Sequence, residues 1–205
     1  MTLDGIVPAS AAAFALASLL IELTPGPNMT WLVLVAVEEG RRAALSAVAG
    51  VALGLSLIGA IAALGVAEVV QSSPVAYEVL RWAGIAFLLY LAWDGWRGEP
   101  GEEEADGRRY FLRGFMANVL NPKAFIFYIA VLPAFVDRAG AIAEQTYVLT
   151  AIYVAIATGV HFTLVMIGGA LRPYLNRPET EKRLRRVLAV ALALIALWFA
   201  WSTAR

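Results

Sequence analysis

The sequence predicts an all-α membrane protein with six transmembrane helices, arranged as two inverted repeats of three. Three observations predict this fold class. Of the 205 residues, 60% are hydrophobic and only 16% are charged, whereas an average globular domain is roughly 45–50% apolar and about 25% charged. The apolar residues fall into six long stretches. The first and the fourth of these stretches are interrupted by proline motifs.

The charge balance and the absence of cysteine exclude several classes of function. The chain carries 16 basic and 16 acidic residues, so it lacks the positive charge that favours nucleic-acid binding, and we expect no nucleic-acid partner. It contains no cysteine, which excludes disulfides, thiolate metal sites and thiol redox chemistry. We therefore expect neither a metal centre nor a cofactor.

The first apolar stretch, Gly5–Val37, is too long for one straight transmembrane helix. At about 1.5 Å per residue it would extend about 50 Å, whereas the hydrocarbon core is about 30 Å thick. It is interrupted by Glu22 and by the motif Thr24-Pro25-Gly26-Pro27-Asn28. Because Met1–Asp4 contains an acid and no base, the start does not resemble a secretory signal, and we expect a retained transmembrane span.

The next two stretches have the length of ordinary spans. Ala43–Ala67 contains no charged residue, and Pro74–Trp96 carries its charges near its two ends, where they reach the interface. Ser46, Gly50 and Gly54 form a stripe of small residues on the first of these spans. Such a stripe lets two helices approach closely, either within one chain or across a homodimer, and the sequence leaves both options open.

The second half repeats the order of one broken stretch followed by two regular ones. The fourth stretch, Gly114–Val136, is interrupted by Asn121-Pro122-Lys123. The fifth and sixth, Gln145–Leu171 and Val187–Ala204, contain no acidic or basic side chain other than His161. Because proline removes a backbone donor and clashes with the preceding turn, we expect spans one and four to break where protein or a watery cavity covers them.

Loop charges predict the orientation of the six spans. Basic residues concentrate in the loops after spans one, three and five, and the positive-inside rule places these loops in the cytoplasm and both termini outside. The predicted cytoplasmic side holds Arg41, Arg42, Arg97, Arg108, Arg109, Arg113, Arg172, Arg177, Lys182, Arg183, Arg185 and Arg186, and the other side holds Arg81, Arg138 and Arg205.

An odd number of spans per half gives the two halves opposite orientations in the membrane. This is the inverted repeat of many secondary transporters, in which paired interrupted segments indicate a central binding site. We expect one transmembrane transporter domain over 1–205. Within it, repeat 1 covers about 5–97, a cytoplasmic linker about 98–113, and repeat 2 about 114–204.

The two predicted breaks offer chemistry that suits an anion. Asn121 is a good N-cap and Pro122 fits the first helical position, while Gly26 is expected to end the first half of span one and Asn28 to cap a restart at Met29. Each restarted helix presents unpaired N–H groups and a positive dipole end. We expect the site to be shaped by Thr24, Pro25, Gly26, Pro27 and Pro122.

Lys123 is the strongest single indication of a binding site. A lysine in the middle of a span costs about 2.5–3.5 kcal/mol on insertion scales and normally faces a cavity or a partner. The sequence favours Lys123, Asn28 and Asn121 as contacts for a substrate carboxylate. It also allows Lys123 merely to neutralise Glu22 or the carboxyl end of a helix, and the two asparagines to be structural caps.

Two titratable residues within the spans are candidates for proton coupling. Glu22 is interpreted as a proton carrier or as a partner for a substrate ammonium group. His161 titrates near neutrality and is a possible relay, although a lone histidine packed between helices is the more common situation.

The motifs resemble those of the LysE/RhtB family of amino-acid exporters, in the family order, over about the first two thirds of the chain. The matching residues are Thr24-Pro25-Gly26-Pro27-Asn28, Gly40-Arg41-Arg42, Gly50, Gly54, Gly65, Arg81-Trp82, Gly84, Leu88-Leu89-Tyr90, Gly114-Phe115, Asn121-Pro122-Lys123-Ala124, Phe127, Leu132-Pro133 and Phe135. The sequence departs from the pattern at Ala44, Ala92 and Ala134, so the resemblance does not fix the substrate.

The resemblance implies a secondary transporter of the bacterial inner membrane rather than an enzyme. It implies export of amino acids or close derivatives from the cytoplasm, by antiport driven by the proton gradient. Two alternatives carry less weight. A metal-ion exporter of the wider superfamily would need more carboxylates, cysteines or histidines within the spans. An intramembrane serine hydrolase using Ser56 and His161 would need a nucleophile elbow or oxyanion site, which this glycine-rich helix does not indicate.

Overall fold

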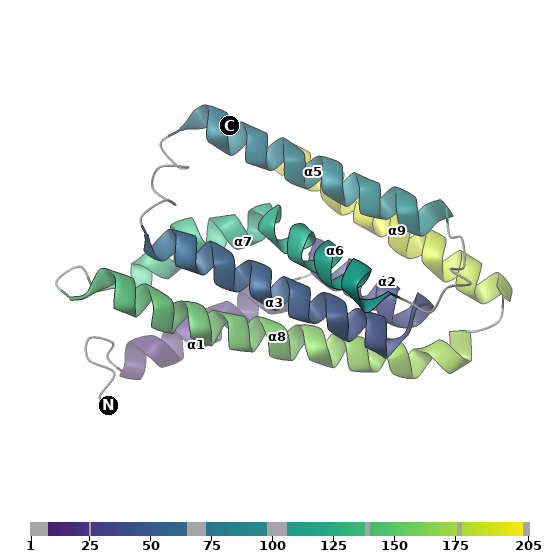
Figure 1. Cartoon of the computed structure of the whole chain (residues 1–205), viewed down its shortest axis with the longest axis horizontal. Helices are drawn as coiled ribbons and strands as arrows, with labels where there is room; N and C mark the ends of the chain where they lie inside the picture. Colours follow the sequence, from purple (N-terminus) through teal and green to yellow (C-terminus); the bar gives the residue numbers. More distant parts are fainter. Residues whose placement is uncertain are drawn as a thin grey trace.

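The computed structural model describes residues 8–24, 26–64, 73–97, 106–137, 140–175 and 178–202. All regular structure in these ranges is helical, and no strand occurs within them, which confirms the predicted all-α class. Figure 1 shows the helices running side by side along the long axis of the molecule. The start of the first helix and the end of the last lie at the same end of this bundle (Figure 1).

Both predicted breaks occur at the proline motifs. The first broken pair is α1 (Pro8–Leu23) and α2 (Pro27–Glu38), and the two helices bend by 60°. The second pair bends by 49°. It consists of α6 (Gly107–Val119) followed by α7 (Pro122–Ile126), a π-helical segment η1 (Phe127–Val131) and a 3₁₀ turn η2 (Leu132–Phe135).

The second irregularity in the fourth stretch, at η1 and η2, was not predicted. Pro133 lies in the first turn of η2. Proline has no N–H and its ring clashes with the carbonyl four residues earlier, so the α-helical ladder widens into a π segment before it. The Leu132-Pro133 pair in the sequence could have predicted this irregularity.

Four further helices lie in the described ranges. They are α3 (Arg41–Ala63), α5 (Pro74–Arg97), α8 (Ile142–Leu175) and α9 (Pro178–Ser202). By length and composition, α3 and most of α8 are long and apolar enough to cross a membrane, and each bent pair also qualifies when it is counted as one span. The apolar stretches in α5 and α9 are shorter. The described chain therefore has two to four candidate spans by this criterion.

The helix α6 begins at Gly107, within the range that the sequence predicts for the cytoplasmic linker. Asp106 is the N-cap, and its side chain accepts a hydrogen bond of 2.9 Å from the Arg108 backbone N–H. Arg113 then lies within the helix and pairs with Asp94 of α5 at 2.6 Å. Positions 98–105 lie outside the described residues.

Close packing of α3 against α6 accounts for the stripe of small residues. A side chain at Gly50 would overlap the backbone of Phe111, and one at Gly54 would lie 3.0 Å from the carbonyl oxygen of Phe115. The Ser46 hydroxyl donates to the carbonyl oxygen of Gly107 at 2.6 Å. The stripe therefore packs within the chain, and α6 covers the surface that the sequence offered for a homodimer.

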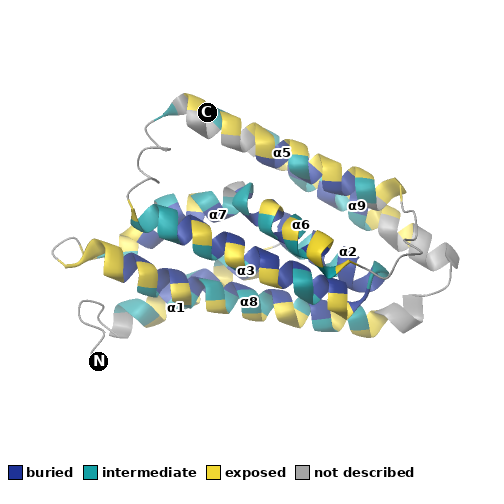
Figure 2. Ribbon diagram, in the orientation of Figure 1, coloured by how far each residue is buried: buried dark blue, intermediate teal, exposed yellow. Residues whose placement is uncertain are grey.

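Burial separates the inner helices from the outward surface. Much of α2 and one face of α3 are buried, whereas α5 and α9 expose many large apolar side chains (Figure 2). The exposed aromatic residues on these two helices include Trp82, Trp93, Trp96, Trp198 and Trp201. An apolar surface of this extent is unusual for a water-soluble monomer and is what a helix facing lipid requires.

Gly50→Ala should destabilise the protein, because the added methyl group overlaps the backbone of α6. Overpacking of this kind costs about 1–3 kcal/mol. Gly159→Ala is the matched control, since a side chain there meets nothing within 4 Å and alanine is favoured over glycine in a helix by about 1 kcal/mol. The free energy of unfolding in detergent micelles measures both changes. Equal effects of the two substitutions would contradict the packing of α3 on α6.

Candidate functional site

A polar pocket lies where the two broken helix pairs meet. It brings together seven of the predicted site residues: Glu22, Gly26, Pro27, Asn28, Asn121, Lys123 and His161. Its other lining residues are Met29, Leu55, Asn118, Ala124 and Tyr153. The space that a water-sized sphere can occupy is about 10 Å³, which is room for about one water molecule. In this conformation, which we call closed, the pocket is therefore too small for an amino acid.

The remaining predicted site residues lie beside this pocket or outside the described chain. Thr24 does not line it, and its exposed hydroxyl donates to the carbonyl oxygen of Leu20 at 3.0 Å. Pro122 occupies the first helical position of α7, as predicted. Pro25 lies outside the described residues.

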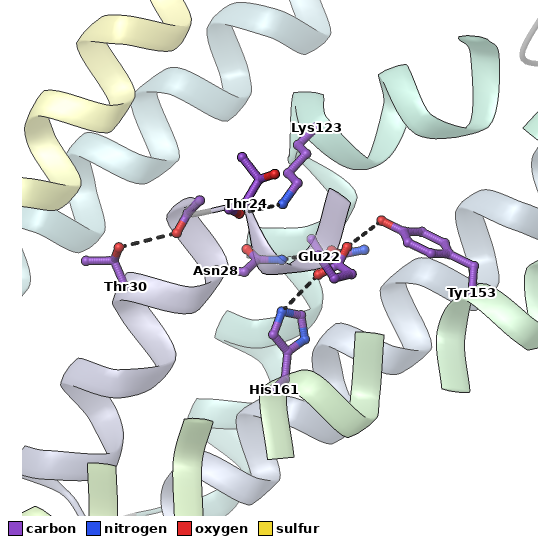
Figure 3. Close-up of polar contacts among 9 residues, drawn as sticks. Glu22, Thr24, Asn28, Thr30, Lys123, Tyr153 and His161 are labelled. Atoms are coloured by element: carbon purple, nitrogen blue, oxygen red, sulfur yellow. Dashed lines mark hydrogen bonds and ion pairs between the residues drawn. The ribbon is translucent and has the colours of Figure 1, made fainter. Parts of the chain in front are cut away.

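Lys123 reaches the carboxyl end of α1. Its Nζ donates to the carbonyl oxygen of Thr24 at 3.0 Å (Figure 3). A cation at this end of a helix is favoured by the helix dipole, and the bond satisfies a carbonyl freed by the break. No ion pair joins Lys123 to Glu22 in the described part of the chain. In this conformation the ammonium group of Lys123 instead contacts the carboxyl end of a helix, which was one of the alternatives that the sequence allowed.

The carboxylate of Glu22 is buried and held by two side chains of α8. The Tyr153 hydroxyl donates to Oε1 at 2.7 Å, and His161 Nε2 lies 3.5 Å from Oε2 (Figure 3). All three side chains are buried. A buried carboxylate needs such partners because its desolvation is costly. His161 therefore faces another titratable group, and its Nδ1 has no hydrogen-bond partner among the described residues.

Asn28 does not cap a helix that restarts at Met29, which corrects the prediction. The helix α2 begins at Pro27, with Gly26 as its N-cap and no side-chain cap. Proline fits the first helical position because the N–H that it lacks has no intrahelical partner there. Asn28 thus lies in the first turn, and its Nδ2 donates to Oδ1 of Asn118 at 2.9 Å.

Asn121 caps α7 as predicted. Its Oδ1 accepts a hydrogen bond of 3.0 Å from the Lys123 backbone N–H, and its carbonyl accepts the first helical bond from Phe125. The cap fixes the direction in which the chain leaves the break. It therefore sets where the Lys123 side chain starts.

Two pocket residues, Asn118 and Tyr153, were missed by the sequence analysis. Asn118 is an amide within an otherwise apolar part of the fourth stretch, one turn before Asn121. Tyr153 precedes His161 by about two helical turns, so both lie on one face of α8. Polar residues at these helical spacings were the available signals.

The geometry does not favour the two alternative functions. Within the described ranges, no group of three or more histidine, cysteine, aspartate or glutamate side chains is placed to hold a metal ion. The hydroxyl of Ser56 donates to the carbonyl of Ala52 in its own helix at 2.8 Å, whereas His161 contacts Glu22. A serine–histidine pair is therefore not formed.

Comparison with known proteins agrees with the resemblance of the motifs. A family model described as "LysE type translocator" matches residues 19–203. The chain is similar to the homoserine/homoserine lactone efflux proteins of Salmonella typhi and Salmonella typhimurium strain LT2, at 26% identity over 195 residues in each case. These alignments cover 89% of this chain and 92% of each relative. No solved structure matches.

The family match covers most of the chain and includes both helix breaks. Its members are translocators, which confirms the prediction of a transporter rather than an enzyme. The chain belongs to the LysE family.

Proposed function

We propose that this protein exports a small zwitterion, an amino acid or a close derivative such as homoserine, from the cytoplasm. The observation that carries the proposal is the pocket between the two helix breaks, whose lining includes a basic side chain, Lys123, and an acidic one, Glu22. An amino acid carries one group of each sign. The names of the two Salmonella relatives support the substrate class.

The carboxylate of the substrate is proposed to bind at Lys123 and at the first turn of α2. An ammonium group has three donors, and the carbonyl of Thr24 accepts one of them. Gly26 and Asn28 line the pocket at the start of α2, where the first N–H groups have no intrahelical partner and the dipole favours an anion. Asn121 contributes by positioning Lys123.

Glu22 is proposed to alternate between a proton and the ammonium group of the substrate. Its carboxyl group already contacts Tyr153 and His161, and His161, whose Nδ1 has no hydrogen-bond partner within the described chain, is proposed as the proton relay. Competition for one carboxylate would couple proton entry to substrate exit. Because the pocket has room for about one water, the surrounding helices must separate to admit an amino acid.

The six-span inverted repeat is proposed as the frame for this movement. The contacts between helices support it. In such a repeat, α1 with α2 corresponds to α6 with α7, α3 corresponds to α8, and α5 corresponds to α9. Accordingly, α3 packs on α6 as α8 packs on α1 and α2, and the corresponding helices contact each other, α3 with α8 and α5 with α9. In this scheme 1–205 form one transporter domain, with repeats at about 5–97 and 114–204. Positions of about 98–113 connect the two repeats.

The orientation is proposed from where basic residues gather. Helices α3, α6 and α9 begin, and α5 and α8 end, at one end of the bundle (Figure 1). Arg41 donates to the Met166 carbonyl there, and Arg113 pairs with Asp94. The positive-inside rule places this end in the cytoplasm and both termini outside, in a bacterial inner membrane.

Lys123→Ala should reduce efflux of radiolabelled homoserine from proteoliposomes to the level of protein-free vesicles, because the substrate carboxylate loses its cation. Arg108→Ala is the matched control, since it removes an exposed cation at the start of α6. The amount of folded protein is measured in the same vesicles. Unchanged efflux by the Lys123 variant, at equal protein, contradicts the site assignment.

Glu22→Gln should abolish the stimulation of efflux by a proton gradient. The amide can still accept a hydrogen bond from Tyr153, but it cannot ionise, so no proton is exchanged. Exchange of labelled for unlabelled homoserine without a gradient should persist, with weaker affinity. Glu144→Gln, an exposed acid in the first turn of α8, should behave as wild type. Normal gradient stimulation in the Glu22 variant would exclude this residue as the proton carrier.

A further inference from the structure

The hydrogen-bonded pair of Asn28 and Asn118 is buried, and two of its polar groups form no hydrogen bond within the described chain. Only 6% of Asn28 and 1% of Asn118 is exposed, and both side chains line the pocket. One bond of 2.9 Å joins them. Oδ1 of Asn28 and Nδ2 of Asn118 have no partner within the described chain.

The number of missing hydrogen bonds does not depend on how the two amides are oriented. Each asparagine carries one oxygen and one NH₂ group, and turning both amides over would recreate the same single bond. In either arrangement one carbonyl oxygen and one NH₂ group of the pair stay unpaired. Buried polar groups in native proteins rarely lack partners, so we expect these two groups to bind one.

The free groups match a neutral group better than a charged one. They offer one acceptor and one donor, which is the complement of a hydroxyl group, while two other residues of the same pocket, Lys123 and Glu22, supply the charged partners for a zwitterion. The rest of the wall includes Met29, Leu55 and Ala124, which offer apolar contacts.

We infer that the Asn28–Asn118 pair binds a hydroxyl or carbonyl oxygen in the side chain of the substrate. This inference rests on the proposed export of a small zwitterion and narrows its substrate class to small neutral amino acids, or their derivatives, with an oxygen function on the side chain. A site that bonds a substrate hydroxyl rejects the analogue without it, because its own polar groups then stay buried and unpaired.

The test compares homoserine with 2-aminobutyrate, which lacks only the hydroxyl. Proteoliposomes are loaded with both labelled amino acids at equal concentration, and the ratio of their efflux rates is measured. The wild type should favour homoserine by about 10- to 100-fold, as expected for one buried hydrogen-bonding site. In Asn118→Leu the ratio should fall to about 1, through loss of homoserine efflux while 2-aminobutyrate efflux persists or rises.

Tyr128→Phe is the matched control for this variant. It also removes a buried hydrogen bond, from the Tyr128 hydroxyl to the Leu55 carbonyl at 3.0 Å, but Tyr128 does not line the pocket. Its efflux ratio should equal that of the wild type. Persistent 2-aminobutyrate efflux in Asn118→Leu shows that this variant is folded.

Each outcome separates this inference from the proposed function. A wild-type ratio near 1, with both amino acids exported, would leave the export of zwitterions intact and overturn the role of the amide pair, whose partner would then be a water molecule. A high ratio that Asn118→Leu preserves would also overturn it. Export of neither amino acid above protein-free vesicles would contradict the proposed function itself.

Discussion

A backbone carbonyl freed by a helix break in a membrane has no water to bond, and the break survives only if protein groups replace that water. In this protein the replacement is the bond from the Lys123 ammonium to the Thr24 carbonyl at 3.0 Å. It joins the break of the first helix pair to the break of the second. The cation and the end of α1 are therefore held together, and the pocket forms around their meeting point.

The close packing of α3 against α6 forms part of the pocket wall. Glycines at the contact let Asn118 come beside Asn28, while α8 brings Tyr153 and His161 to Glu22 from the other side. The same arrangement closes the site, because the pocket retains room for about one water. Transport in the proposed cycle requires these helices to separate, and the polar groups that hold the closed state are the ones that a substrate would contact.

Local chemistry made the breaks predictable, whereas the partners across the pocket depend on packing between distant helices. Proline and asparagine fix where α7 begins, and the same rule for Pro27 would have placed the start of α2 correctly. Asn118 and Tyr153 gave no comparable local signal. Their roles follow from which helix faces α2 and which faces α1, and this depends on contacts between residues 90 and 131 positions apart. For the same reason, the sequence did not indicate which helix packs against the stripe of small residues.

Protection of one engineered cysteine tests most directly whether the pocket between the breaks is the substrate site. The chain has no cysteine, so Met29→Cys places a single thiol on the pocket wall, and Arg108→Cys provides an exposed control at the start of α6. The rate of alkylation by a small maleimide is measured with increasing homoserine. The account predicts that homoserine slows alkylation at position 29, with half-protection near the concentration that half-saturates efflux, and leaves position 108 unchanged. An alkylation rate at position 29 that saturating homoserine does not lower would contradict it.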